Sequence, residues 1–413
     1  MSKKIIFLFF ILGLIYLSLS LYRIWQINLP LVSPIDLVES LPQLAPIFKK
    51  PGAKVVFGFL PYWNMKDSDK LYVKSLTHLA YFGIDLNEDG SIKKYDKPGE
   101  KEPGWNKLNS TAFAVLSRQI KLLGKKLILV VRVMENDQIE NLLGHPDSRQ
   151  KAIESILQTV ADKQFDGVNV DFEYMGYPDE STRALFSQFV SDLSAKCKME
   201  AARPARNATH SVAGGCEMSL DVFADSASKN RLYDLKALAK SADVIIVMAY
   251  DFFRPSSSQS GPVAPLRGKC INSNSCLDYD IVTSISDVSK LVPAYKLLLG
   301  VPFYGYEWQT VDREFLARTY PKTGGLATYK RVRDLLSDAT ISSLSATWSA
   351  ATFTPYLSYF EDGNIYQIHY DDENSLRLKI EFVHQAKLAG IAIWALGYEL
   401  PYDNLWQTIA KDL

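Results

Sequence analysis

The stretch that decides the fold reads Asp166-Gly167-Val168-Asn169-Val170-Asp171-Phe172-Glu173-Tyr174. Apolar and polar side chains alternate along it, and alternate side chains of a β-strand point to opposite faces. Asn169, Asp171 and Glu173 therefore share one face. Burying three polar side chains on one face is costly unless they form a satisfied network. We interpret this face as the interior of a closed barrel, with Glu173 at the C-terminal end of the strand, where barrel enzymes place their catalytic groups.

A cluster of capping residues at the turn from strand to helix is the alternative interpretation. Such a cluster would explain Glu173 or Asp179 alone. It would not explain three polar side chains in register, so we prefer the barrel.

The rest of the chain contains further apolar runs of the kind that form strands buried on both faces. They are Val55–Leu60, Leu76–Ile84, Leu127–Val133, Glu217–Val222, Val244–Tyr250, Leu297–Val301 and Gly390–Leu396. Segments with apolar spacings of three and four lie between them, for example Thr111–Leu123, Gln150–Ala161 and Ser181–Ala195. Eight strands alternating with helices predict an α/β fold of the TIM (β/α)8 barrel class.

The interval between the last two runs is too long for one helix. Some 85 residues separate Tyr304 from Ala389. Within them, Thr352–Tyr359 and Ile365–Tyr370 alternate aromatic and polar residues as strands do. We predict a small α+β insertion, about residues 306–387, between strands seven and eight.

The N-terminus differs from the rest of the chain. Lys3 and Lys4 precede an apolar run, Ile5–Tyr22, which is about long enough to cross a bilayer as a helix. We expect residues 1–22 to be an uncleaved signal anchor, with a cleaved signal peptide or a buried soluble helix as the alternatives. Residues 23–53 contain five prolines and read as a linker to a catalytic domain at 54–413. The lysines should stay cytoplasmic, so we expect a single-pass membrane protein with its domain outside, or a secreted protein if the signal is cleaved.

Cysteine usage and charge bear on the compartment and the partners. An even count of four cysteines in an exported chain suggests two disulfides, and four unrelated thiols are the alternative. The candidate pairs, each bracketing a polar stretch, are Cys197 with Cys216 and Cys270 with Cys276. No zinc-like spacing is present, so no metal is expected. The 46 basic and 46 acidic residues balance without long runs of like charge, which gives no reason to expect nucleic acid as a partner.

The central stretch resembles the signature of glycoside hydrolase family 18, D-G-x-D-x-D-x-E on the fourth barrel strand. Asp166, Gly167, Asp171 and Glu173 match it. Asn169 stands where most chitinases have the first Asp of the D-x-D-x-E core, and this N-x-D-x-E form is similar to the spore-cortex and peptidoglycan N-acetylglucosaminidase subgroup. The change removes a carboxylate from the strand, so we expect less like-charge repulsion on Asp171.

Further segments resemble the family in the expected order, over roughly residues 54–413. They are Met248-Ala249-Tyr250-Asp251, residues 261–266, residues 300–305, Trp348 with Pro355 and Tyr356, Tyr370-Asp371-Asp372, and Gly390-Ile391-Ala392-Ile393-Trp394. The third strand departs from the pattern, because Val130-Val131-Arg132-Val133 lacks the Ser/Gly-Gly common in chitinases.

The resemblance implies substrate-assisted catalysis, an exception to the two-carboxylate scheme of glycosidases. Protonated Glu173 would donate to the glycosidic oxygen while the 2-acetamido carbonyl of the substrate attacks the anomeric carbon. Asp171 would hold the acetamide N–H, and Tyr250 would donate a hydrogen bond to the attacking carbonyl oxygen. Glu173 would then act as the base for the incoming water. No cofactor is implied, and the pKa of Glu173 should be raised.

The resemblance also implies sugar-contacting residues, namely Asn169, Met248, Asp251 and Trp394 as the floor of the sugar site. Phe82 and Tyr306 are further candidates because they lie near strand ends. Ordinary packing is the alternative for Met248, Trp394, Phe82 and Tyr306, and for Asp251 the alternative is to orient Tyr250. We expect a monomeric, exported hydrolase of β-1,4-linked N-acetylglucosamine glycans, namely chitin, chitooligosaccharides or peptidoglycan, with a slight preference for the cell-wall glycan. A lectin that retains the barrel but not the turnover, and a wall-associated morphogenesis protein, are the alternatives.

Overall fold

The computed structural model describes residues 54–201, 216–268 and 277–413, and Lys54–Leu413 forms one compact unit. The predicted anchor (1–22), the linker (23–53) and the pair Cys270 and Cys276 lie outside the described residues. Within the described ranges, no helix is long and apolar enough to cross a membrane. Cys197 and Cys216 form a disulfide, which confirms that pair.

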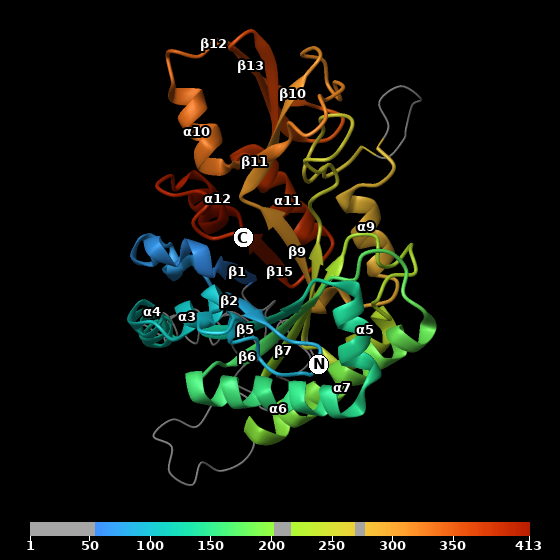
Figure 1. Cartoon of the computed structure of the whole chain (residues 1–413). Coiled ribbons are helices and arrows are strands. Elements are labelled where there is room, and N and C mark those ends of the chain that lie inside the picture. Colours follow the sequence, from blue (N-terminus) through green and yellow to red (C-terminus); the bar gives the residue numbers. More distant parts are fainter. Residues whose placement is uncertain (1–53, 202–215, 269–276) are drawn as a thin grey trace, which may run out of the picture. The chain divides into compact units, whose positions relative to one another are not determined.

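Eight parallel strands of the described chain close into a barrel in the order β1-β15-β9-β8-β7-β6-β5-β2, seen in the middle of Figure 1. They are β1 (Val55–Pro61), β2 (His78–Asp85), β5 (Lys126–Val133), β6 (Gly167–Phe172), β7 (Glu217–Phe223), β8 (Val244–Met248), β9 (Leu297–Pro302) and β15 (Gly390–Trp394). Each of the predicted apolar runs contributes one of these strands, so the TIM-barrel prediction is confirmed.

Helices follow the strands and cover the outside of the barrel (Figure 1). They are α3 (Pro103–Leu108), α4 (Thr111–Leu122), α5 (Asn136–Gly144), α6 (Pro146–Lys163), α7 (Glu180–Ala201), α8 (Leu235–Ser241), α9 (Ile281–Val288), α11 (Glu373–Gln385) and α12 (Asn404–Asp412), with short 3-10 turns η1 (Tyr62–Lys70), η2 (Val73–Ser75) and η3 (Ala294–Lys296) and a small ribbon of β3 (Tyr95–Lys97) and β4 (Glu100–Lys101). Local sequence sets their starts. The Ser110 side chain accepts from the Phe113 N–H at the start of α4, and Asp280 accepts from the Thr283 N–H at the start of α9.

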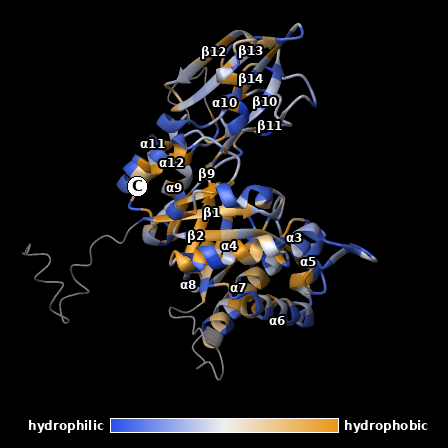
Figure 2. Cartoon of the chain, turned by 90° about the vertical axis from the view of Figure 1, so that its left-hand side faces the viewer, coloured by the Kyte–Doolittle hydropathy of each residue, from blue (hydrophilic) through white to orange (hydrophobic). Residues whose placement is uncertain are grey.

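The core has two layers, one on each face of the barrel wall. The outer faces of the strands pack against the helices, as where the Phe172 ring of β6 lies 5.7 Å from Phe186 and 5.6 Å from Phe189 of α7. A separate apolar cluster fills the interior, and it includes Phe57, Phe59, Ala80, Phe82, Ile128, Val130, Ile246, Leu298 and Ala392. Figure 2 shows the strands as an apolar centre beneath helices with polar outer surfaces. Any polar side chain inside the barrel therefore lies in a medium of low polarity.

The predicted insertion between strands seven and eight is also confirmed. Within residues 304–369 an antiparallel sheet of order β11-β10-β14-β13-β12 packs on one helix, α10 (Tyr329–Ser337), at the top of Figure 1. The strands are β10 (Tyr304–Thr310), β11 (Gly325–Thr328), β12 (Ser342–Ser349), β13 (Thr354–Glu361) and β14 (Asn364–His369). Immediately after β14, the Asp371 carboxylate forms a fully buried ion pair with Lys379 of α11 and so connects the insertion to a barrel helix.

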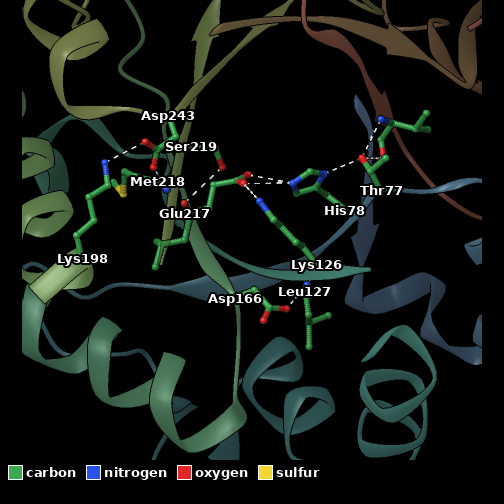
Figure 3. Close-up of polar contacts among 12 residues, drawn as sticks. Thr77, His78, Lys126, Leu127, Asp166, Lys198, Glu217, Met218, Ser219 and Asp243 are labelled. Carbon is green, nitrogen blue, oxygen red and sulfur yellow. Dashed lines mark hydrogen bonds and ion pairs between the residues drawn. The ribbon is translucent and has the colours of Figure 1, made fainter. Parts of the chain in front are cut away.

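The N-terminal ends of the strands form a polar floor, which Figure 3 shows in close-up. The Glu217 carboxylate lies between the His78 ring, at 3.1 Å, and the Lys126 ammonium group. Asp166 joins two strands here, because its side chain accepts from the Leu127 N–H at 2.8 Å. A Cβ on Gly167 would lie 2.4 Å from the carbonyl oxygen of Glu217, so only glycine fits. The first two residues of the quoted stretch thus hold the floor together, opposite the predicted catalytic end.

Candidate active site

The polar face of β6 points into the barrel, as its alternation predicts. Asn169 is 0% exposed and Asp171 is 3% exposed. Glu173 follows the last residue of the strand and is partly buried, and its backbone N–H donates to the Val133 carbonyl of β5 at 3.0 Å. That bond continues the ladder by one residue and fixes the carboxylic acid at the C-terminal mouth of the barrel.

The two carboxyls of this face, Glu173 and Asp171, have raised pKa values. Burial raises the pKa of Glu173; the Arg254 guanidinium opposes this shift and the nearby Asp251 charge adds to it. Burial raises the pKa of Asp171 well above its usual range, and the charges of Glu173 and Asp221 raise it further. A carboxyl that keeps its proton towards neutral pH can serve as a general acid.

Tyr250 follows β8 by two residues and reaches the same interior. Burial raises its pKa well above the usual value, and the next effects are the charges of Asp221 and Asp171. The hydroxyl therefore remains protonated and can donate a hydrogen bond. Met248, the last residue of β8, is buried.

Asp251, the next residue after Tyr250, fixes the turn that follows β8. Asp251 has a positive φ of 59°, which is uncommon for a residue other than glycine. Its Oδ1 accepts from the Tyr306 hydroxyl at 2.8 Å and from the Tyr304 hydroxyl. Tyr306 is thus buried and occupied with Asp251, while its predicted contact with sugar remains a prediction.

A cluster of aromatic side chains lies at the C-terminal ends of β2 and β15. The Trp394 ring packs edge-on against Phe82 at 4.6 Å between centroids, and against the 41% exposed Trp63 at 6.5 Å. Trp394 itself is partly exposed, whereas Phe82 is buried beneath the Arg132 guanidinium. Trp394 and Trp63 therefore remain accessible to a ligand, and the buried Phe82 ring contacts both of them.

Comparison with known proteins identifies the group to which this architecture belongs. The sequence model of glycosyl hydrolases family 18 matches residues 55–399. This chain belongs to family 18. The match spans the barrel and the insertion together, and it includes every segment that the resemblance rests on.

Relatives and solved structures agree with this assignment. The class V chitinase of Arabidopsis thaliana is 27% identical over 264 residues, 62% of this chain and 64% of that protein. The cortical fragment-lytic enzyme of Bacillus anthracis is 20% identical over 350 residues, 82% of this chain and 68% of that protein. The Group IV chitinase of Ostrinia furnacalis, solved in complex with allosamidin, has the same fold, with a TM-score of 0.72 at 22% identity over 87% of this chain and 98% of that one. The chain covers 53% of the length of a further relative from Bacillus subtilis (strain 168), so for this relative and the Arabidopsis one it covers less than two thirds.

Asp171 has a further carboxyl neighbour that the family signature does not include. The charge of Asp221 on β7 raises the pKa of Asp171. The weaker like-charge repulsion expected from Asn169 remains a prediction. Asp221 is 3% exposed and lies beside Asn169. The signal that could have found it is the alternation Glu217, Ser219, Asp221, which repeats the pattern of β6 on the next strand.

Arg132 was also missed as a member of the site. It pairs in register with Asp171 across β5 and β6, so its side chain faces the interior. It forms an ion pair with Asp85 of β2, and its charge lowers the pKa of Asp171 and of Glu173. Arg132 occupies the third-strand position at which the sequence departs from the common chitinase pattern.

Proposed function

We propose that this member of family 18 hydrolyses β-1,4-linked N-acetylglucosamine glycans by retaining, substrate-assisted catalysis. The observation that carries the proposal is the inner face of β6, where Asp171 and Glu173 stand two residues apart with raised pKa values. A donor hydroxyl, Tyr250, lies near them on the segment that follows β8. An acid, a second carboxyl and a hydroxyl donor are the groups that an intramolecular acetamide attack needs.

In this mechanism Glu173 donates its proton to the glycosidic oxygen as the bond to the leaving sugar breaks. The 2-acetamido carbonyl oxygen of the substrate attacks the anomeric carbon, and the glycan is cleaved with an oxazolinium-like intermediate. Asp171 accepts a hydrogen bond from the acetamide N–H, and Tyr250 donates one to the attacking oxygen. Holding that oxygen beside the anomeric carbon gives the high effective concentration of an intramolecular nucleophile. Water, deprotonated by Glu173, then opens the ring.

The remaining predicted residues hold the sugar rather than react with it. Trp394 supplies an apolar face at the mouth, and aromatic faces suit the apolar faces of sugar rings. Asp251 is held by two tyrosine hydroxyls, which keeps the turn carrying Tyr250 in place. Phe82 packs against Trp394, and Met248 is buried at the end of β8.

Among glycans of this type we favour peptidoglycan over chitin. The N-x-D-x-E form at Asn169 and the similarity to a protein named cortical fragment-lytic enzyme support this choice. We also propose that residues 1–22 anchor the chain at the cell membrane with the domain outside, since an apolar run follows Lys3 and Lys4. Full recovery of the chain in the soluble fraction without detergent would contradict this anchoring.

The decisive test compares the purified full chain with its Glu173→Gln variant. The substrates are a fluorogenic β-linked chitooligosaccharide and purified peptidoglycan. Loss of the general acid should lower turnover by about 10² or more. Glu180→Gln, an exposed carboxyl at the start of α7, is the matched control and should stay within about twofold, since its charge is solvated. If the wild type shows no turnover on either substrate and both proteins bind glycan equally, the chain is a lectin.

A further inference from the structure

The inner face of β7 carries a carboxylate that contacts the inner face of β6. Asn169 pairs in register with Ser219, and Asp221 stands two residues further along the same face of β7. The Asn169 side-chain amide donates to Asp221 Oδ1 at 3.0 Å and to Ser219 Oγ at 3.3 Å. All three residues are at most 3% exposed. The amide is therefore fixed by β7, with both of its N–H groups directed towards that strand.

Two buried oxygens on β6 lack a hydrogen-bond partner. Asn169 Oδ1 and Asp171 Oδ1 are both buried, and neither has a hydrogen-bond partner among the described residues. An amide oxygen can only accept, so a partner for it must carry a hydrogen. A proton on the Asp171 carboxyl would supply such a donor within the same face.

Asp221 also acts on this proton through its charge. Burial raises the pKa of Asp221 well above its usual range. The hydrogen bond from Asn169 opposes this shift, and the charge of Glu173 adds to it. Asp221 in turn raises the pKa of Asp171. The other charged or titratable groups around the three carboxyls are Arg132 of β5, Tyr233 before α8, and Tyr250, Asp251 and Arg254 after β8. Interacting carboxyls of this kind titrate as a set rather than singly.

We propose that Asp221, held by the amide of Asn169, is a positioning residue of the hydrolase: β7 supplies the second interior carboxylate that the family signature places on β6 at position 169. Asp221 does not reach the reacting atoms in this scheme. It orients Asn169 and, in its ionised form, favours the proton on Asp171 until substrate binds. The proposal rests on the proposed hydrolase function.

The test exchanges the two groups. Asp221→Asn removes the charge, Asn169→Asp adds one, and the double variant Asn169→Asp with Asp221→Asn restores one carboxylate and one amide with the hydrogen bond reversed. Ser219→Ala is the matched control, because it removes the other acceptor of Asn169 without changing charge. Each full-length variant is assayed on the fluorogenic chitooligosaccharide for kcat, KM and the pH dependence of kcat/KM, with a thermal melt to confirm folding.

Without the Asp221 charge, Asp171 releases its proton at lower pH, since a like charge favours the protonated form. Asp221→Asn should therefore lower kcat about tenfold with KM within about twofold, and move the alkaline limb down by about one pH unit. The exchanged double variant should return kcat to within about threefold of the wild type and bring the limb back. Ser219→Ala should leave the limb in place. An Asp221→Asn enzyme with wild-type kcat and limb would overturn the proposal, as would a folded double variant no better than Asp221→Asn.

A second readout does not depend on turnover. Isotope-edited infrared spectra of the unliganded full chain follow the protonated carboxyl band during a pH titration. The band should be lost at lower pH in Asp221→Asn than in the wild type, and an unchanged titration would overturn the inference. If the wild type fails to hydrolyse glycan while the titration shifts as expected, the proposed function is wrong and the coupling between Asp221 and β6 stands.

Discussion

The charge of Glu217 should be a major contributor to the stability of the barrel floor. Its side chain is 12% exposed and lies between the His78 ring and the Lys126 ammonium group (Figure 3). Burial alone favours the neutral acid. Hydrogen bonds and charges from His78 and Lys126 outweigh burial and lower the pKa from 4.5 to about 2. Folding therefore stabilises the ionised form of Glu217 relative to its neutral form.

The magnitude follows from the shift. Each pKa unit corresponds to about 1.4 kcal/mol, so the anion contributes up to about 3 kcal/mol at pH 7. Because the folded pKa lies below the unfolded value, this contribution is complete above about pH 4.5 and is lost as the pH falls towards 2. At pH 3.5 about 2 kcal/mol of it should remain. Glu217→Gln keeps the shape and removes the charge, so it should lower the free energy of unfolding by these amounts.

Urea unfolding of the wild type and of Glu217→Gln at pH 7 and pH 3.5 measures both values. Glu381→Gln serves as the control, because Glu381 is 48% exposed in an ion pair with Arg377 on the same helix. Such a surface pair contributes at most about 0.5 kcal/mol. A difference below about 0.5 kcal/mol for Glu217→Gln at pH 7, or the same difference at both pH values, would refute the reasoning.

Two further predictions concern the sugar platform and the disulfide. Trp394→Ala should raise KM for a chitooligosaccharide about tenfold, because an exposed aromatic face is lost, while the pH limbs of kcat/KM stay in place. Steady-state kinetics across pH measure both, and a moved limb with unchanged KM would contradict the platform role. Replacing Cys197 and Cys216 by serine should cost about 3 kcal/mol of unfolding free energy, as expected for a crosslink across 19 residues. Urea unfolding with and without reductant tests this value. Reductant should lower the unfolding free energy of the wild type by this amount and leave that of the double serine variant unchanged.

The barrel could be predicted because its strands are buried on both faces. Such strands appear in the sequence as continuous apolar runs, and each run lies where a strand is found. The ends were less predictable. The runs were expected to reach Tyr250 and Leu396, whereas β8 ends at Met248 and β15 ends at Trp394. At β8 the backbone turns at Asp251, whose positive φ is not encoded in the apolar pattern.

The residues of the candidate site that lie on one strand could be predicted from the sequence, and those on neighbouring strands could not. Asn169, Asp171 and Glu173 lie on one strand, so their common face follows from a period of two. The disulfide between Cys197 and Cys216 was predictable as a pair that brackets a polar stretch. Asp221 and Arg132 each sit on a neighbouring strand, and their place beside β6 depends on strand order and register. A single strand's pattern contains neither quantity.

This difference changes how the departure at position 169 is to be understood. Read along β6 alone, an amide in place of a carboxylate means one charge fewer near Asp171. Read around the barrel, the carboxylate stands 3.0 Å away on β7 as Asp221, and the amide is what holds it. Charges on three other segments act on Asp171 and Glu173. Arg132 lowers the pKa of both carboxyls, Asp221 raises that of Asp171, and Asp251 raises that of Glu173. In a closed interior of low polarity, the number and sign of the charges matter more than the strand that carries them. The motif on β6 therefore does not by itself determine the protonation of Asp171. The further carboxyl, Asp221, is located by the hydrogen bond that Asn169 donates to it.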